Sequence, residues 1–183
     1  MIIAVGGPPG SGKTTAADLY ARTYGAVFIS GGRMFREMAA ERGMDLVAFG
    51  EYAEAHHEVD RQLDDMILGA VRNATAEGRD VVVDGRIQAH LLARANVRAY
   101  AVLVTAPIDV RAKRVADRER KSERAALEEI LARERSERER YRAIYGIDLE
   151  DVGVFDLEVD SKDIRPEAIV KRVHEGAVAW AKV

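Results

Sequence analysis

Short apolar runs alternate along the chain with longer stretches in which apolar residues recur at helical spacing. The apolar runs predict strands at Ile2–Gly6, Ala26–Ile29, Val81–Asp84, Ala99–Thr105 and Phe155–Asp160. Helical patterns occupy the intervals, at residues 13–24, 33–42, 45–54, 57–76, 88–95, 108–120, 124–145 and 166–181. The runs at 81–83 and 102–104 are apolar at every position, which is typical of strands covered on both faces. Strands alternating with helices therefore predict an α/β fold with a parallel sheet between two helical layers.

Two regions depart from this alternation. Between the second and third strands lies a helical excursion at about 37–78, which is too long for a simple crossover and predicts a small helical insert. The wholly polar segment 117–124, DRERKSER, separates two helices and is either a plain connection or a mobile lid. We expect residues 1–183 to form a single domain, with a core made of 1–36 and 79–183.

Composition narrows the class of protein. The chain is 48% hydrophobic and 32% charged, with a net charge of −3, which argues against nucleic-acid binding through the whole surface but leaves a local basic groove open. It has no cysteine, so disulfides, thiolate zinc sites and cysteine nucleophiles are excluded. There is no signal-peptide pattern at the start, and no apolar run approaches the ~20 residues of a membrane helix. We expect a cytoplasmic monomer without membrane or nucleic-acid partners.

A phosphate-binding motif follows the first strand. Residues 7–14, GPPGSGKT, match the pattern G-x-x-x-x-G-K-[ST] and lead directly into the helix at 13–24. Glycines allow backbone N–H groups to turn toward phosphate oxygens, and the helix N-terminus faces the same anion. Lys13 can reach the outer phosphates and the Thr14 hydroxyl can ligate Mg²⁺. The predicted ATP-binding residues are Gly7, Pro8, Pro9, Gly10, Ser11, Gly12, Lys13, Thr14 and Thr15.

Two other classes of P-loop protein do not fit. A regulatory GTPase should show D-x-x-G and N-K-x-D, yet no glycine has an aspartate three positions earlier, and Asn73 and Asn96 precede Ala and Val. A remodelling ATPase usually ends a strand with an acidic pair, whereas here Asp84 is followed by Gly85 and Arg86.

Several spaced motifs point to a narrower family. They are GGPPGSGKTT (6–15), ISGGRMFRE (29–37), VVVDGR (81–86), KRVADRER (113–120), RERSERERY (133–141) and YGID (145–148). In this order they resemble the nucleoside monophosphate kinases, most closely the archaeal-type cytidylate kinases, over nearly the whole chain. The resemblance implies a five-stranded P-loop NTPase fold with a monophosphate-binding insert and a lid. It also implies ATP-dependent phosphoryl transfer to a pyrimidine nucleoside monophosphate. We expect the acceptor to be CMP or dCMP, giving ADP and CDP or dCDP.

The resemblance also assigns roles to individual residues. Arg36 and Arg86 match the arginines that hold the acceptor phosphate, and Asp84 matches the carboxylate that orients Mg²⁺ through water. Arg114 and Arg118 match the lid arginines that close over the transferring phosphate. From the residues alone, Arg36 and Arg86 could also be ordinary surface arginines, and Asp84 a turn-forming residue before glycine.

The segment 133–140, RERSERER, divides into two groups of arginines. Arg133 and Arg140 are seven residues apart, so they lie within ~20° of each other on the helix surface and border its apolar stripe. The resemblance makes these two an acceptor-phosphate clamp. Arg135, Arg138 and Arg142 are interpreted as solvated or structural, and the alternative is that the whole cluster is solvated.

The acceptor base is less well defined. Ser30 is either a base contact or the start of the next helix, and Glu137 is a candidate contact to a ribose hydroxyl. Asp60 and Asp64 either accept from a cytosine amino group or form an exposed acidic edge facing Arg61. In some cytidylate kinases an aspartate follows D-G-R, whereas this chain has Ile87, which leaves the base and sugar contacts open.

Two alternatives to the CMP kinase hypothesis remain. One is an adenylate or broad-specificity monophosphate kinase. The other is a non-kinase, RNA-associated factor that uses 109–145, where twelve of the 28 Lys and Arg residues lie. A kinase requires Arg36, Arg86 and at least one of Arg133 and Arg140 to converge near Lys13, whereas an RNA module would point them outward along a stripe.

Overall fold

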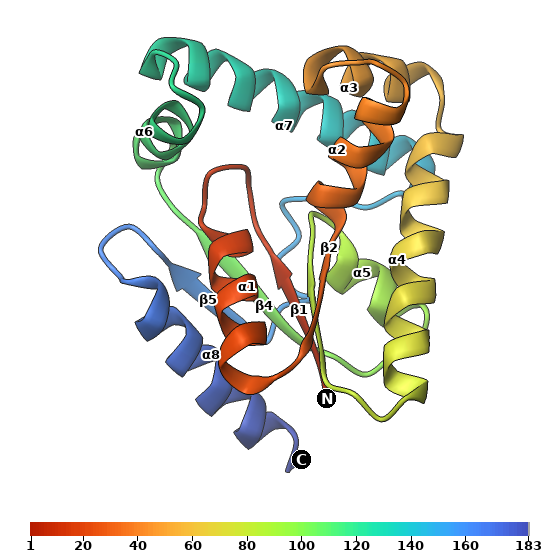
Figure 1. Ribbon diagram of the computed structural model, residues 1–183, viewed down its shortest axis with the longest axis vertical. Helices are drawn as coiled ribbons and strands as arrows, with labels where there is room; N and C mark the ends of the chain where they lie inside the picture. The colour runs from red at the N-terminus through yellow and green to blue at the C-terminus, as the bar shows by residue number, and fades with distance from the viewer. Residues whose placement is uncertain (183) are drawn as a thin grey trace.

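All five predicted strands form, and they pair in parallel in the order β2-β3-β1-β4-β5. A computed structural model describes residues 1–182 of the protein (Figure 1). The strands are β1 (Ile2–Gly6), β2 (Val27–Ser30), β3 (Val81–Asp84), β4 (Tyr100–Thr105) and β5 (Leu157–Asp160). This confirms the prediction of an α/β fold with a five-stranded parallel sheet, and only the strand ends shift by one or two residues.

Helices cover both faces of the sheet, which is why the central strands are apolar throughout. On one face α1 (Lys13–Tyr24) and α8 (Pro166–Trp180) pack over Val5, Val82 and Val102. On the other face α4 (Glu58–Ala76) and α5 (Gln88–Arg94) belong to a core that contains Val81 and Val83. Successive side chains of a strand point to opposite faces, so a strand buried on both sides needs an apolar residue at every position.

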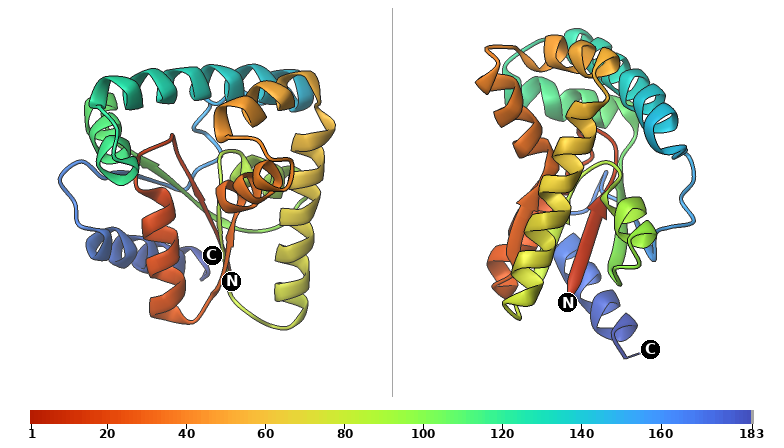
Figure 2. Two further views of the ribbon diagram at one scale, coloured as in Figure 1. Left: turned by 45° about the horizontal axis from the view of Figure 1, so that its top comes forward. Right: turned by 90° about the vertical axis from the view of Figure 1, so that its right-hand side faces the viewer.

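The excursion between β2 and β3 is helical, as predicted. It consists of α2 (Gly31–Glu41), α3 (Leu46–Ala55) and α4, and Figure 2 shows α2 and α3 beyond the carboxyl ends of the strands. Met38, Phe49 and Leu63 join these helices to the core on one face of the sheet. Since α4 itself packs on β2 and β3, it also serves as the crossover helix between those strands.

A helical hairpin closes the carboxyl edge of the sheet. The helix α6 (Ile108–Glu119) is followed by α7 (Glu123–Tyr145), which passes over the strand ends toward α3 (Figures 1 and 2). The polar break predicted at 117–124 is only residues 120–122, because Arg120 adopts a φ of 54° and Ser122 caps α7 through Ala125 N at 3.2 Å. Val115, Ala126 and Ile130 form a small core between the two helices.

Across residues 1–182, no helix combines the length and the apolar character needed to cross a bilayer.

Candidate active site

The P-loop lies at the carboxyl end of β1 and is packed tightly against its surroundings. Gly10 adopts a φ of +80°, and a Cβ at this position would come within 2.7 Å of the Arg111 carbonyl oxygen. At Gly7, where φ is +144°, a Cβ would lie 2.1 Å from the Val104 carbonyl oxygen. Only glycine tolerates both the backbone conformation and the contact, so the motif fixes the loop on β4 and α6.

A buried arginine that the sequence analysis did not single out braces this loop. Arg111 is 8% exposed and donates to Pro9 O at 3.2 Å and to Ala106 O at 3.0 Å. The same guanidinium forms an ion pair with Glu134 of α7 at 2.8 Å. Arg111 thus links the P-loop, the β4–α6 connection and the overlying helix. The signal that could have identified it is a lone arginine on the apolar face of an amphipathic helix.

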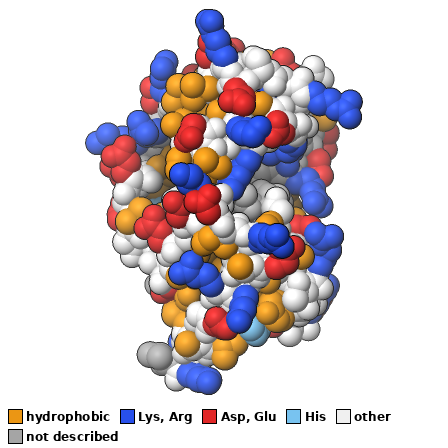
Figure 3. All heavy atoms as spheres, turned by 90° about the vertical axis from the view of Figure 1, so that its left-hand side faces the viewer, with side chains coloured by type: hydrophobic (Ala, Val, Ile, Leu, Met, Phe, Trp, Pro, Cys, Tyr) orange, Lys and Arg blue, Asp and Glu red, His pale blue; other side chains and the backbone are white. Residues whose placement is uncertain are grey.

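A cavity of about 410 Å³ separates the P-loop from α7. Lys and Arg side chains border a recess on the face drawn in Figure 3. The cavity is lined by Lys13, Arg36, Arg86, Arg114, Arg118, Arg133 and Arg140. These residues come from five separate segments of the chain, so the fold gathers the cations that the sequence analysis selected around one space.

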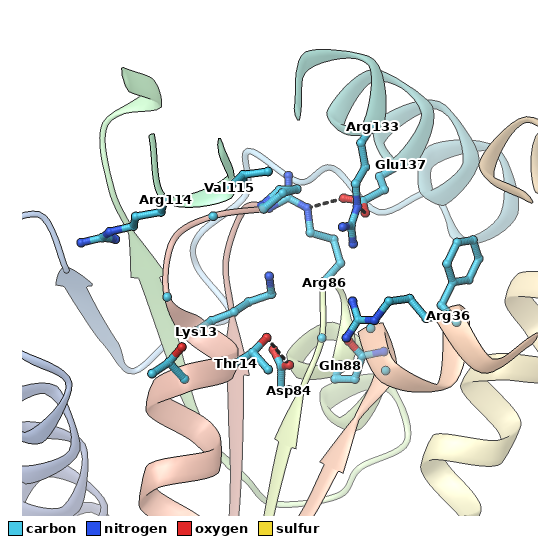
Figure 4. A pocket seen from close by; sticks show the side chains of 18 of the residues that line it. Lys13, Thr14, Arg36, Asp84, Arg86, Gln88, Arg114, Val115, Arg133 and Glu137 are labelled. Atoms are coloured by element: carbon cyan, nitrogen blue, oxygen red, sulfur yellow. Dashed lines mark hydrogen bonds and ion pairs between the residues drawn. The ribbon is translucent and has the colours of Figure 1, made fainter. Parts of the chain in front are cut away.

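Asp84 and Thr14 form an oxygen-rich corner beside Lys13 (Figure 4). Asp84 is 1% exposed, and its Oδ2 accepts hydrogen bonds from Thr14 Oγ1 at 2.7 Å and from Ser30 Oγ at 3.1 Å. Its Oδ1 is buried and has no hydrogen-bond partner among the described side chains and backbone. An unpartnered buried carboxylate oxygen is costly unless a ligand completes it, and Mg²⁺ prefers such oxygen donors. This corner therefore fits a magnesium ion.

Lys13 points into the cavity from the start of α1 (Figure 4), and its Nζ lies 3.4 Å from Pro8 O. Burial lowers the Lys13 pKa to about 8, with Asp84 opposing the shift and Arg133 adding to it. Burial destabilises the positive charge of Lys13 in the free protein, and a bound anion would stabilise that charge. The site is accordingly arranged for a polyanionic ligand.

Glu137 of α7 holds two of the predicted arginines together. Its Oε1 lies 2.7 Å from Arg133 Nε and its Oε2 lies 3.0 Å from Arg86 Nε (Figure 4). Burial opposes ionisation of Glu137, but Arg133 and Arg86 outweigh it and set its pKa below the ordinary value. Arg36 enters the same cavity from α2, where partial burial, Arg133 and Arg118 lower its pKa. Together these contacts place three arginines opposite the P-loop.

Arg140 lines the cavity wall but is bound to the protein at every guanidinium nitrogen. Its Nε pairs with Asp60 at 2.9 Å, and its Nη2 donates to the same carboxylate at 3.5 Å. Its Nη1 donates to Ser136 Oγ at 2.8 Å and to Gly50 O at 3.4 Å. Asp60 is 1% exposed and does not line the cavity. The geometry favours Arg140 and Asp60 as a brace between α7 and the insert. Arg133 is better placed than Arg140 for phosphate.

The alternative of an exposed acidic edge formed by Asp60 and Asp64 is wrong, because Asp64 is also buried, at 6% exposure. Asp64 accepts from Tyr145 Oη at 2.6 Å and from Gln88 Nε2 at 3.4 Å. Gln88 lines the cavity, while its Oε1 accepts from Ile87 N at 3.1 Å. Sequence reasoning missed Gln88 and Tyr145, since no local pattern signals a contact between α4, α5 and the end of α7.

We expect Asp64→Asn to remove a pH-dependent loss of stability. Burial raises the Asp64 pKa to about 7. Between about pH 4 and 7 the folded state therefore keeps a proton that the unfolded state has released, and the unfolding free energy falls as the pH rises through this window. The free energy of unfolding can be measured with denaturant at pH 5 and pH 8. Its decrease between these two pH values should be about 2–3 kcal/mol larger for wild type than for Asp64→Asn.

The exposed Asp109, on α6, supplies the control. Asp109→Asn should keep the wild-type pH dependence. An identical change between pH 5 and pH 8 in Asp64→Asn and wild type would contradict the assignment.

Three further predicted site residues have partners within the protein. Ser30 caps α2 by accepting from Arg33 N at 3.3 Å, so its side chain follows the helix-start alternative and does not line the cavity. Arg114 points toward the loop after β5 and donates to Ser161 Oγ and Ser161 O, each at 2.8 Å (Figure 4). Arg118 is exposed at the cavity rim and pairs with Glu119.

The outer arginines of α7 are solvent-exposed, as their spacing predicted. Arg135, Arg138 and Arg142 are exposed, and Arg138 lies 3.6 Å from Glu150. The cluster at 133–140 is therefore neither wholly solvated nor wholly directed at the cavity.

Comparison with solved structures identifies the fold. The chain aligns with an uncharacterised protein from Eubacterium ventriosum at a TM-score of 0.72 and 18% identity, covering 98% of this chain and 99% of that one. It aligns with a shikimate kinase from Aquifex aeolicus at a TM-score of 0.59 and 22% identity, covering 99% and 98%. The fold is that of the P-loop kinases of small molecules.

Comparison of sequences gives the family. The model of the cytidylate kinase-like family matches residues 2–163. A cytidylate kinase of Methanocaldococcus jannaschii is 39% identical over 162 residues, or 88% of each chain. One of Haloquadratum walsbyi is 40% identical over 180 residues, or 98% of this chain and 90% of the relative. The chain belongs to the cytidylate kinase-like family, which confirms the resemblance inferred from its motifs.

Proposed function

We propose that the protein transfers the γ-phosphate of ATP to CMP, and to dCMP, producing ADP and the nucleoside diphosphate. The observation that carries the proposal is the convergence of Arg36, Arg86 and Arg133 on one cavity opposite Lys13. Two anions brought head to head repel each other, and cations between them offset that repulsion. The cytidylate kinase activity named for the relatives supports the choice of acceptor.

On the donor side, the P-loop binds the triphosphate of ATP. Backbone N–H groups around Gly10 and Gly12 and the N-terminus of α1 provide donors for the phosphates, and Lys13 adds a positive charge. Thr14 and Asp84 would hold Mg²⁺, which supplies charge neutralisation to the phosphates when it is bound. Arg114 and Arg118, on α6, border the same space and fit contacts to the transferring phosphate.

On the acceptor side, Arg36, Arg86 and Arg133 bind the monophosphate. No general base is needed, because a phosphate monoester with a second pKa of about 6 is already mostly a dianion at neutral pH. The protein's task is to hold the attacking phosphate oxygen in line with the γ-phosphorus and to stabilise the charge that spreads in the transition state. Gln88 faces the cavity next to this group and fits a contact to the acceptor nucleoside.

The alternatives make different demands. An RNA-binding module would direct the arginines of 109–145 outward in one stripe, but Arg111 is buried and Arg133 and Arg140 face the cavity. An adenylate or broad-specificity kinase would share the phosphate geometry and differ only in the acceptors that it accepts.

The experiment is a panel of NMP and dNMP acceptors with Mg-ATP, followed by ADP release. We expect CMP and dCMP to be the preferred acceptors by at least about tenfold in kcat/KM over AMP and GMP. A preference for AMP would replace the proposal with adenylate kinase activity, and no ADP release with any monophosphate would refute phosphotransfer altogether.

A further inference from the structure

We propose that Glu137 is a positioning residue that holds Arg86 and Arg133 as a rigid pair, with their free nitrogen atoms directed at the acceptor phosphate. This inference rests on the proposed function. It assigns Glu137 a different role from a ribose contact, since both of its oxygens already face arginines.

The geometry of the pair is specific. Glu137 Oε1 accepts a hydrogen bond from Arg133 Nε at 2.7 Å, and Oε2 forms an ion pair with Arg86 Nε at 3.0 Å without hydrogen-bond geometry. Binding through Nε leaves two N–H₂ groups on each guanidinium. Within residues 1–182 no protein acceptor hydrogen-bonds to those groups of Arg86 or Arg133. Planar guanidinium groups of this kind suit the bidentate recognition of phosphate.

The location of Glu137 shows why a carboxylate belongs here. Its side chain is only 6% exposed, and it lies on α7, whereas Arg86 follows β3. Two arginine side chains alone in one cavity would repel each other and would lose many rotamers on binding a ligand. A carboxylate between them offsets the repulsion and fixes both side chains before the acceptor arrives.

The same charge opposes acceptor binding, and this gives the proposal a distinctive signature. A dianionic phosphate that contacts Arg86 and Arg133 approaches the negative charge of Glu137, which disfavours binding. Removal of that charge should therefore preserve or improve the affinity for CMP. It should lower turnover, because the arginines lose their orientation toward the transition state. A residue with only a structural role would lower affinity, turnover and stability together.

The test compares Glu137→Gln with wild type in the full-length protein. CMP binding by isothermal titration calorimetry should be unchanged or up to about tenfold tighter, while kcat with Mg-ATP falls about 100-fold, at the lower end of the range for losing one preorganised interaction. Glu128→Gln, which removes an exposed carboxylate of α7 that pairs with Arg124, should leave both quantities unchanged.

A second variant keeps the test decisive if Glu137→Gln folds poorly. Glu137→Asp retains the charge with a shorter reach, so it should bind CMP no more tightly than wild type and should recover part of the kcat lost in Glu137→Gln. Parallel losses of CMP affinity and kcat in both variants, or a wild-type kcat in Glu137→Gln, would overturn the proposal. A wild-type protein that phosphorylates no CMP would instead count against the proposed function.

Discussion

Replacement of Lys13 by alanine should reduce kcat on the order of 10³-fold or more while leaving the fold intact. Lys13 is the cation that the P-loop aims at the outer phosphates, and it faces the three acceptor arginines across the cavity. Loss of one preorganised charge in a water-poor site costs about 10²–10³ in rate, and loss of a cation at a transferring phosphate costs about 10³–10⁵.

The unfolding temperature of Lys13→Ala distinguishes a loss of catalysis from misfolding. The lowered Lys13 pKa, about 8, shows that burial disfavours its charge in the free protein. Lys13→Ala should therefore unfold at the same temperature as wild type or a higher one. Lys171→Ala, at an exposed position on α8 paired with Glu175, is the matched control and should keep wild-type kcat. A Lys13→Ala variant that retained a tenth of wild-type kcat would contradict the assigned role.

The fold could be predicted from the sequence because its signals are local. Unbroken apolar runs at 81–83 and 102–104 indicate strands covered on both faces, and the P-loop motif fixes one strand–loop–helix unit. Parallel strands then bring their carboxyl ends to one edge, so Asp84 and Arg86 had to lie near Lys13. Helices were predicted correctly between β2 and β3, although the last of them, α4, also packs on the sheet.

The candidate site was predicted only in part, because some of its contacts join segments with no local relation. Spacing placed Arg133 and Arg140 on one face of α7. It could not show that Arg140 forms an ion pair with the buried Asp60. Nor could it show that Arg133 contacts Glu137 through Nε alone. The buried Asp64 accepts a hydrogen bond from Tyr145, 81 residues later, which no periodicity reveals. Contacts between buried polar side chains of different elements are set by tertiary packing, so local sequence patterns do not predict them.

Arg133→Ala should impair use of the acceptor far more than binding of the donor. We expect kcat/KM for CMP to fall about 10²–10³-fold, since a guanidinium at the acceptor phosphate is lost and the Glu137 charge is less well neutralised. The dissociation constant for ATP should change by no more than about threefold, because the P-loop contacts remain. Steady-state kinetics with varied CMP and titration calorimetry with ATP measure the two effects separately.

Arg135→Ala, two residues along the same helix at an exposed position, should leave both quantities unchanged. Equal losses for CMP and ATP in Arg133→Ala would count against the assignment of Arg133 to the acceptor.

The double variant Arg133→Ala/Glu137→Gln gives a stricter test. If Glu137, left with Arg86 alone, repels the acceptor in Arg133→Ala, removing its charge should recover part of the lost CMP affinity. The two substitutions would then be less than additive for binding, as expected for residues in direct contact.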